Sequence, residues 1–169
     1  MPKMSTPAFT RAYSSFSHVD SDGQAQMVDV SDKRVTKRIA TARGEIQFST
    51  PEVVDLIRSN SMKKGDVLGV ARVAGIMAVK STPTIIPLCH PIMITKIKNN
   101  VEVQDQSTVV VETTVQCDGK TGVEMEAITG AMASLVTVYD MCKAVDKHMV
   151  ISQVYVKQKQ GGKHDFKIQ

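Results

Sequence analysis

Gly122-Val-Glu-Met-Glu-Ala-Ile-Thr-Gly-Ala-Met-Ala-Ser-Leu-Val-Thr-Val-Tyr-Asp-Met-Cys-Lys-Ala-Val-Asp146 is one continuous segment that predicts a long helix, apolar on nearly every side. A helix of this kind is expected to be buried. Near its end it carries Asp140 and Lys143, which are three residues apart and therefore share one face. A buried carboxylate or ammonium is costly unless it is paired or used. This pair is therefore the first candidate for chemistry in the chain.

Upstream of this segment, the sequence predicts a strand followed by two helices. Residues 34–49 alternate loosely and predict one long or broken strand. Thr50 as N-cap, followed by a proline, predicts a helix over residues 51–59. Asp66 predicts the cap of a second helix that runs to about Lys80. This second helix is also apolar nearly all round, so it too is expected to be buried.

Between the second helix and the long one, the pattern changes to extended chain. Residues 81–91 carry three prolines, which predicts a rigid path without a helix. Two β-branched runs, residues 92–104 and 108–117, are joined by a polar turn and predict a hairpin. Thr121-Gly-Val-Glu124 predicts a capping box that opens the long helix. Residues 150–156 predict a final strand.

The order of these elements predicts an α+β fold of the ferredoxin-like, split β-α-β type. Its antiparallel sheet should carry the helices on one face, with one extra helix in the first crossover. In a single copy of this fold, one face of the sheet and parts of the two apolar helices would be exposed to solvent. We therefore expect the chain to form oligomers that bury these surfaces.

Composition and charge fit a single globular domain that attracts anions. The chain has 169 residues, of which 42% are apolar and 22% charged. The net charge is +4, and a basic surface attracts phosphorylated metabolites, nucleic acid or acidic lipid, with a merely solvated positive face as the alternative. The basic residues gather near the first strand and the C-terminal end, at Lys33, Arg34, Lys37, Arg38, Arg43, Lys157, Lys159, Lys163 and Lys167.

The cysteines indicate a reducing compartment. Their number is odd, three, and no C-x-x-C pair occurs, which argues against a disulfide framework and a structural zinc site. No apolar run approaches the length of a membrane span. The first 19 residues contain Lys3 and Arg11 but no acid, which suits a flexible tail or a transit peptide. We expect a cytoplasmic protein, with an organelle as the alternative if this arm is a targeting remnant.

Several other side chains are candidates for chemistry. His90 ends a loop stiffened by prolines, so a catalytic role and a structural role are equally plausible. Glu124 has a role in the capping box, whereas Glu126 has none and could be a functional or a surface carboxylate. Lys64 and Lys159 are candidates for one cationic pocket around Lys143, or are plain surface lysines. A lysine held among cations would have a lowered pKa and could exchange protons near neutrality.

Phosphate-binding loops are absent from the sequence. Neither G-x-x-x-x-G-K-[ST] nor G-x-G-x-x-G occurs. Any phosphate would therefore be held by lysine, arginine and helix N-termini.

Seven short motifs occur in the order seen in one family. They are Met27-Val-Asp-Val30, Lys64-Gly-Asp-Val67, Ala71-Arg-Val-Ala-Gly75, Ile86-Pro-Leu-Cys-His-Pro91, Lys120-Thr-Gly-Val-Glu-Met-Glu-Ala127, Tyr139-Asp-Met-Cys-Lys-Ala144 and Gly161-Gly-Lys163. From about Phe16 to Phe166 the chain resembles the cyclic pyranopterin monophosphate synthases, the molybdenum cofactor biosynthesis protein C family. The long-helix motif alone is highly specific.

The resemblance implies a lyase of early molybdenum cofactor (molybdopterin) biosynthesis. Such an enzyme converts cyclised dihydro-GTP (3′,8-cyclo-7,8-dihydroguanosine triphosphate), supplied by an upstream radical enzyme, into cyclic pyranopterin monophosphate and pyrophosphate. The resemblance also implies a homohexamer, a trimer of dimers with the active site at the dimer interface, and no cofactor, nucleic-acid or membrane partner. Residues 27–169 would be a single catalytic domain behind a flexible arm, residues 1–26. Metal dependence stays open, because pyrophosphate can leave as a magnesium complex without protein ligands.

Matching motifs imply roles for individual residues. Asp140 and Lys143 would be the catalytic pair. The tail departs from the family pattern, with Gln160 in place of a serine and His164 where two residues are usual, so its loop is one residue shorter and Lys159 and Lys163 are the least secure positions. Substrate contacts, without a metal ligand, would be made by Leu88, Cys89, His90, Met125, Glu126, Lys64, Glu124, Arg38, Lys159 and, more loosely, Lys80.

Two functions of other classes compete with the enzyme. An RNA-binding module of this fold would need exposed aromatic side chains on its central strands, and the predicted hairpin has none. A non-catalytic oligomer that binds a nucleotide without converting it remains as the alternative.

Overall fold

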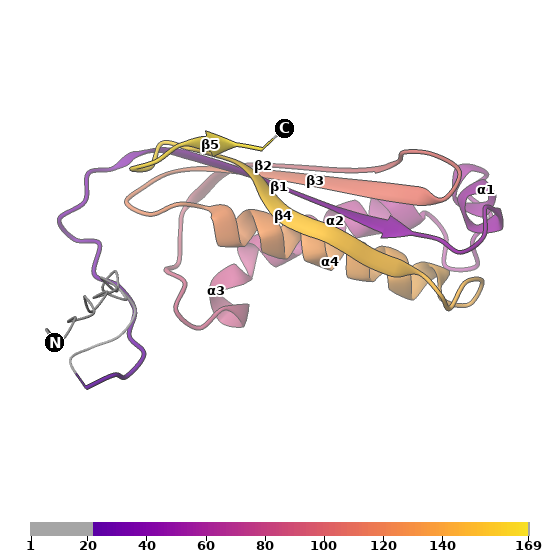
Figure 1. The fold of residues 1–169 in the computed structure, drawn as a ribbon, viewed down its shortest axis with the longest axis horizontal. Coiled ribbons are helices and arrows are strands. Elements are labelled where there is room, and N and C mark those ends of the chain that lie inside the picture. Colours follow the sequence, from indigo (N-terminus) through magenta and orange to yellow (C-terminus); the bar gives the residue numbers. More distant parts are fainter. Residues whose placement is uncertain (1–21, 169) are drawn as a thin grey trace, which may run out of the picture.

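The computed structural model describes residues 22–168, so most of the predicted N-terminal arm, residues 1–26, lies outside the described part. Helices and strands alternate in the order predicted for a split β-α-β fold (Figure 1). Along the chain they are β1 (Thr36–Gln47), α1 (Glu52–Arg58), α2 (Val67–Lys80), α3 (Thr82–Ile85), β2 (Ile94–Val103), β3 (Thr108–Gly119), α4 (Glu124–Cys142), β4 (Val150–Gln160) and β5 (Phe166–Lys167).

The sheet has the strand order β2-β3-β1-β4-β5, and every neighbouring pair is antiparallel. Helices α2 and α4 lie together on one face of it, as Figure 1 shows. The predicted α+β, ferredoxin-like fold is therefore confirmed, including the extra helix before the hairpin. Helix α1 and the C-terminal end of α4 lie at one end of the molecule, and the start of α4 lies at the other.

The core lies between the sheet and these two helices and is built from small and β-branched side chains. Ala40, Ala42 and Ile46 alternate along β1 toward the helices and are fully buried. On α4 the matching positions are Ala127, Ala131 and Leu135, also fully buried and spaced by four residues. Small side chains on both layers allow α4 to pack close to the sheet, which fixes the position of both ends of α4.

The opposite face of the sheet is polar rather than apolar. Thr41 and Thr114 share a hydrogen bond of 2.9 Å across β1 and β3. Arg43 pairs with Glu45 at 3.0 Å, and Lys157 of β4 pairs with Glu112 of β3 at 2.5 Å. We expected this face to need cover, but its side chains satisfy one another, so the sheet gives no reason for oligomerisation.

The helices are not buried all round, contrary to the prediction from their composition. Val73 and Met77 on α2 are 57% and 62% exposed, and Val136 on α4 is 53% exposed. The inner faces alone fill the core, which leaves an apolar outer surface on both helices. Within residues 22–168, no helix is long and apolar enough to cross a membrane.

Three element predictions need correction. Residues 81–91 contain the short helix α3, because proline is tolerated in the first turn of a helix, where its missing N–H is not needed. Pro51, not Thr50, is the N-cap of α1, although the Thr50 hydroxyl accepts a 3.4 Å hydrogen bond from the Glu52 amide. Strand β4 continues to Gln160 and pairs with β5, which the sequence pattern did not predict.

Candidate active site

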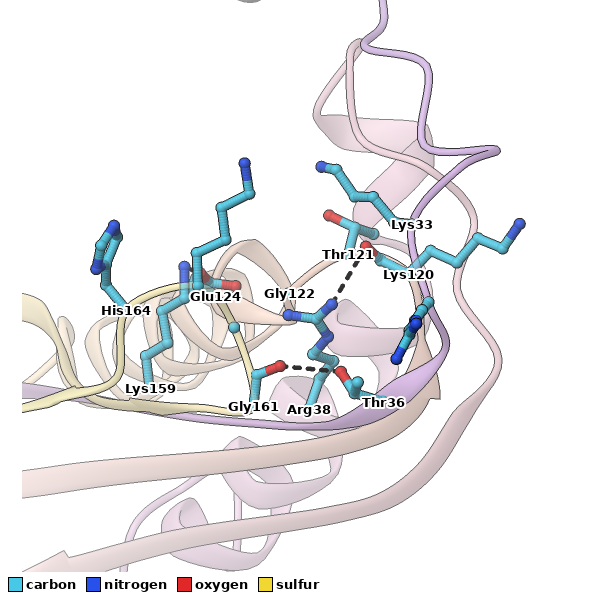
Figure 2. A pocket seen from close by; sticks show the side chains of 13 residues that line it. Lys33, Thr36, Arg38, Lys120, Thr121, Gly122, Glu124, Lys159, Gly161 and His164 are labelled. Atoms are coloured by element: carbon cyan, nitrogen blue, oxygen red, sulfur yellow. Dashed lines mark hydrogen bonds and ion pairs between the residues drawn. The ribbon is translucent and has the colours of Figure 1, made fainter.

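A basic cavity of about 560 Å³ opens where β1, β4 and the loop before α4 meet (Figure 2). It contains six basic side chains and one histidine against a single carboxylate, that of Glu124. Such a surplus of cations suits a polyanion. The lining residues are Lys33, Arg34, Thr36, Arg38, Lys120, Thr121, Gly122, Glu124, Lys159, Gly161, Gly162, Lys163 and His164.

Arg38 stands at the centre of the basic cavity, on β1. Figure 2 shows its guanidinium group directed toward the loop that precedes α4. The Nε atom donates to the Gly119 carbonyl at 3.3 Å and Nη2 donates to the Lys120 carbonyl at 3.4 Å. The planar fork of arginine can hold two carbonyls at once, so Arg38 fixes the loop in addition to supplying charge.

Glu124 has a different role from the one predicted. Among the described residues, no side chain caps the start of α4, whose N-cap is Val123. The capping-box prediction is therefore wrong, because the Glu124 carboxylate instead pairs with the Lys159 ammonium of β4. This ion pair joins the start of α4 to the C-terminal end of β4 and places both side chains on the cavity wall.

A second cavity, of about 550 Å³, continues from the first. Lys33, Thr121, Gly122, Glu124 and Lys163 line both, so the two form one groove with a basic part and a less charged part. The second part contains all five residues predicted from the Leu-Cys-His and Met-Glu motifs, namely Leu88, Cys89, His90, Met125 and Glu126.

Glu126 lies at the bottom of this second part. Its side chain is 2% exposed, and burial raises the pKa of its carboxyl group above the usual value. Burial and the nearby Glu126 carboxylate also raise the pKa of the Cys89 thiol. Of the two roles considered for Glu126, the surface carboxylate is wrong because the residue is buried. The Cys89 thiol is poorly suited to be a nucleophile because its raised pKa leaves little thiolate.

The predicted catalytic pair lies at the other end of α4. The Asp140 carboxylate binds the Lys143 ammonium at 2.7 Å and the Lys64 ammonium at 2.5 Å. Lys64 also donates to the Asp140 carbonyl at 3.1 Å. All three side chains are about half exposed, at 50%, 55% and 48%, rather than buried as predicted. Together with Tyr139, Ala144 and Lys147 they line a cavity of about 530 Å³.

The charges of this cluster reinforce one another. Hydrogen bonds from Lys143 and then Lys64 lower the pKa of Asp140 to about 2. The same contact with Asp140 raises the pKa of Lys143, whereas we expected it to be lowered. The expectation failed because the Lys143 ammonium lies 2.7 Å from the Asp140 carboxylate. A neighbouring opposite charge favours the charged form of the lysine and so raises its pKa.

The two groups of candidate residues are far apart within one chain. From Glu124 to Asp140, α4 rises by about 24 Å. Lys159 pairs with Glu124 and Lys64 with Asp140, so the prediction that both lysines share one pocket is wrong for a single chain. Lys80 belongs to neither group and lines a separate hollow near β2.

The structure also adds residues that sequence reasoning did not assign to the site. Lys33, Lys120, Lys163 and His164 line the basic cavity. The Lys120-Thr-Gly motif directly before the long helix was the usable signal for one of them, because helix N-termini favour anions. Nothing in the local pattern of Lys33 indicated that residues 28–33 would lie beside the start of α4.

Residues 27–162 match the MoaC family, and the chain belongs to that family. A relative from Desulfitobacterium hafniense, named cyclic pyranopterin monophosphate synthase, is 52% identical over 146 residues, which cover 86% of this chain and 89% of the relative. Proteins of the same name from Clostridium perfringens and Bacillus thuringiensis subsp. konkukian are 51% and 49% identical. The two alignments cover 86% and 89% of this chain and 92% and 94% of the respective relatives.

Proposed function

We propose that this protein is a cyclic pyranopterin monophosphate synthase, an enzyme of molybdenum cofactor biosynthesis. It converts cyclised dihydro-GTP to cyclic pyranopterin monophosphate and pyrophosphate. Family membership and the names of the relatives support this function. The structural observation that carries it is the two-part groove, because its basic and less charged parts suit the triphosphate and the base of one nucleotide-derived substrate.

The basic part of the groove is the proposed triphosphate site. Arg38 and Lys159 face it from neighbouring strands, and the start of α4 adds the partial positive charge of a helix N-terminus. In the reaction a sugar hydroxyl attacks the α-phosphorus, a new P–O bond forms, and the bond to the β-phosphate oxygen breaks. Positioned cations stabilise the negative charge that collects on the departing pyrophosphate.

The second part of the groove is the proposed site of the base. Glu126 and His90 offer polar atoms there, while Leu88 and Met125 offer apolar contact. A base with several ring nitrogens needs a few placed polar groups within an otherwise apolar wall. Rearrangement of this ring requires proton transfers, and the cluster around Asp140, whose carboxylate binds two ammonium groups, is the candidate for them.

Asp140 and Lys143 are the proposed proton-transfer pair. Since the pKa of Asp140 is about 2 and that of Lys143 is raised, both are charged at neutral pH. Lys143 therefore enters the reaction as an ammonium group that can donate a proton, and Asp140 holds and orients it. Lys64 completes the cluster from the segment between α1 and α2.

A complete site requires two copies of the chain. Met125, Met132 and Val136 are all exposed and, with Asp140, lie along one side of α4 at spacings of seven and four residues. This apolar stripe joins the groove end to the Asp140 end. Two copies that pack their stripes antiparallel about a twofold axis place each Asp140 against the groove of the other copy. The proposed homohexamer is then a trimer of such dimers, with the active site at the dimer interface.

The remaining parts of the proposal concern its surroundings. An upstream radical enzyme supplies the substrate, no resident cofactor takes part, and pyrophosphate can leave as a magnesium complex. Nucleic acid and membranes are not partners. All three cysteines are free thiols, which supports the cytoplasm as the compartment.

The test uses purified protein incubated with cyclised dihydro-GTP. Pyrophosphate release and the fluorescent pterin formed by oxidation of the product are followed together. Both products should appear with the wild type and disappear with Asp140→Asn and Lys143→Ala. Pyrophosphate without pterin would show that the ring chemistry is assigned wrongly. Neither product, from a folded oligomer that still binds the nucleotide, would reject the synthase in favour of a nucleotide-binding oligomer.

A further inference from the structure

Asp146 is a buried carboxylate that none of the cavities explains. It lies between α4 and β4 and is 3% exposed. Its oxygens accept hydrogen bonds from the Ser49 amide at 2.7 Å, the Ser49 hydroxyl at 2.8 Å and the His148 amide at 2.8 Å. Burial alone would raise the pKa of Asp146, but these donors outweigh burial and the pKa is lowered. The group is therefore a carboxylate at neutral pH.

These hydrogen bonds connect two segments that are distant in sequence. Ser49 lies in the junction between β1 and α1, and Asp146 lies in the turn after α4. The Asp146 amide also donates to the Cys142 carbonyl at 3.1 Å, which continues the end of α4 into this turn. A single side chain thus ties the start of α1 to the end of α4, at the right-hand end of Figure 1.

The two cations of the Asp140 cluster come from α4 itself and from the segment that follows α1. Lys143 is the C-cap residue of α4, three residues before Asp146. Lys64 lies in the segment that leaves α1 and leads to α2. Lys143 and Asp140 lie at the same end of α4, whereas Lys64 reaches Asp140 from the other side of the Asp146 connection. Movement of α1 and its flanking segments relative to α4 would therefore change the Lys64–Asp140 distance.

We propose that Asp146 is a positioning residue for the Lys64–Asp140–Lys143 cluster. It holds the β1–α1 junction, and with it α1 and the segment that carries Lys64, against the end of α4, so that the Lys64 ammonium reaches the Asp140 carboxylate. This role rests on the proposed function in one respect, which is that the cluster acts on substrate. Displacements of about 1 Å at reacting groups can cost up to about a hundredfold in rate, so a connection of this kind affects turnover without touching substrate.

The opposing interpretation is that Asp146 merely stabilises the fold, and three variants separate the two. Asp146→Ala removes all the acceptors. Asp146→Asn keeps an oxygen for the Ser49 hydroxyl and the His148 amide but offers the Ser49 amide no acceptor. Ser49→Ala removes one donor and keeps the backbone, so it remains usable if the alanine variant does not fold. Val115→Ala, in the core of β3 and far from the cluster, is the control for lost stability.

Two readouts are measured on each assembled variant, well below its unfolding temperature. The first is kcat and KM for pterin formation. The second is the rate at which a dilute amine-acylating reagent modifies Lys64, read by peptide mass spectrometry against the exposed Lys96 of β2. An ammonium group held by Asp140 reacts slowly, so release from the ion pair accelerates its labelling.

In Asp146→Ala we expect kcat to fall by about ten- to a hundredfold, KM to change little and Lys64 labelling to accelerate. Ser49→Ala and Asp146→Asn should be intermediate in both readouts. Val115→Ala should lose thermal stability while its kcat and Lys64 labelling stay at wild-type values. If Asp146→Ala behaves like Val115→Ala, with lower Tm but unchanged kcat and labelling, the proposal is overturned.

Failure of the proposed function gives a different result. In that case Lys143→Ala keeps wild-type turnover, and the rate readout no longer concerns the cluster. Labelling of Lys64 then decides alone, since it reports the ion pair with Asp140 and not the reaction. Faster labelling in Asp146→Ala supports the positioning role, and unchanged labelling rejects it.

Discussion

Met125 and Asp140 lie on the same exposed side of α4 but at its opposite ends, about 22 Å apart along the axis. Met125 lines the groove and Asp140 carries the cluster of two lysines. A substrate of nucleotide size cannot touch both ends of one helix of this length. The two ends can act together if α4 of a second copy runs antiparallel to the first.

Mixing two inactive variants should therefore restore activity. Asp140→Asn removes one end of the helix and His90→Ala the other. In a mixed dimer one site carries both changes and the other carries neither. Random equal mixing gives mixed dimers in half of the cases, so we expect about a quarter of wild-type activity. Asp140→Asn mixed with Lys143→Ala is the control, and it should stay inactive. Recovery in the control, or none in the test mixture, would contradict a shared site.

Loss of the ion-pair cluster should reduce turnover more than binding. Asp140→Asn and Lys143→Ala should each lower kcat by about 10²–10⁴-fold, the usual contribution of acid–base catalysis. KM should change little because the groove residues remain. Steady-state kinetics of pterin formation measure both parameters, and Lys96→Ala on β2 serves as a surface-lysine control. Because the pKa of Asp140 is about 2, the acid limb of the wild-type pH profile should not report this carboxylate.

Arg38 should affect binding of the triphosphate. Arg38→Ala removes a charge from the basic cavity and the two hydrogen bonds that hold the loop before α4. Charged hydrogen bonds are worth about 1.5–3 kcal/mol, so KM should rise by roughly ten- to a hundredfold. Arg38→Lys should recover little, since an ammonium group cannot bind both carbonyls. Arg43→Ala, on the polar face of the sheet, should leave KM unchanged.

Glu126→Gln should stabilise the protein at neutral pH. Burial raises the pKa of Glu126, so the folded chain holds this proton more tightly than the unfolded chain does. Its contribution to stability is complete below the unfolded pKa of about 4.5 and is lost as the pH rises through the folded pKa.

Thermal unfolding checks this prediction at two pH values. At about pH 7.5 the glutamine variant should have the higher Tm, by roughly 2–4 °C for each kcal/mol of burial cost removed, and near pH 4 the difference should vanish. Glu124→Gln is the matched control. It breaks the ion pair with Lys159 and should not raise the Tm. Equal Tm values for wild type and Glu126→Gln at both pH values would show that the buried carboxylate costs nothing.

The apolar stripe should be required for assembly. Val136→Asp places a charge in the middle of the stripe, and a desolvated carboxylate without a partner disfavours the interface. We expect smaller particles in light scattering, with a folded circular dichroism spectrum and no turnover. Glu52→Lys, an exposed change on α1, should leave the assembly intact. A fully active, fully assembled Val136→Asp protein would exclude this face as the dimer interface.

The fold could be predicted largely because its signals are local. The Asp66 side chain accepts a hydrogen bond from the Gly69 amide, as its N-cap pattern indicated. The β-branched runs became β2 and β3 with close boundaries. The helix over Thr82–Ile85 was missed because prolines were taken to exclude a helix wherever they occur. Strand β5 was missed because a strand of two residues is too short to show an alternating pattern of apolar and polar side chains.

The site was harder to predict because its geometry depends on distant pairs. The Glu124–Lys159 and Lys64–Asp140 ion pairs join residues from different elements. Neither pair could be read from the sequence around any one of these residues. Glu124 was assigned to a cap that its own motif suggested. Family motifs indicated candidate residues, but the arrangement of these candidates at two ends of one helix follows from the tertiary structure alone.

The length of α4 has a consequence for how this sequence can change. Each helical residue adds about 1.5 Å and a rotation of about 100°. One alanine inserted between Met125 and Asp140 would turn Asp140 away from the side that Met125 occupies, although no site residue is altered. The same insertion in the turn between β2 and β3 would leave both ends of α4 in place. Substitutions along the stripe can be accommodated if they stay apolar, whereas insertions and deletions within α4 cannot.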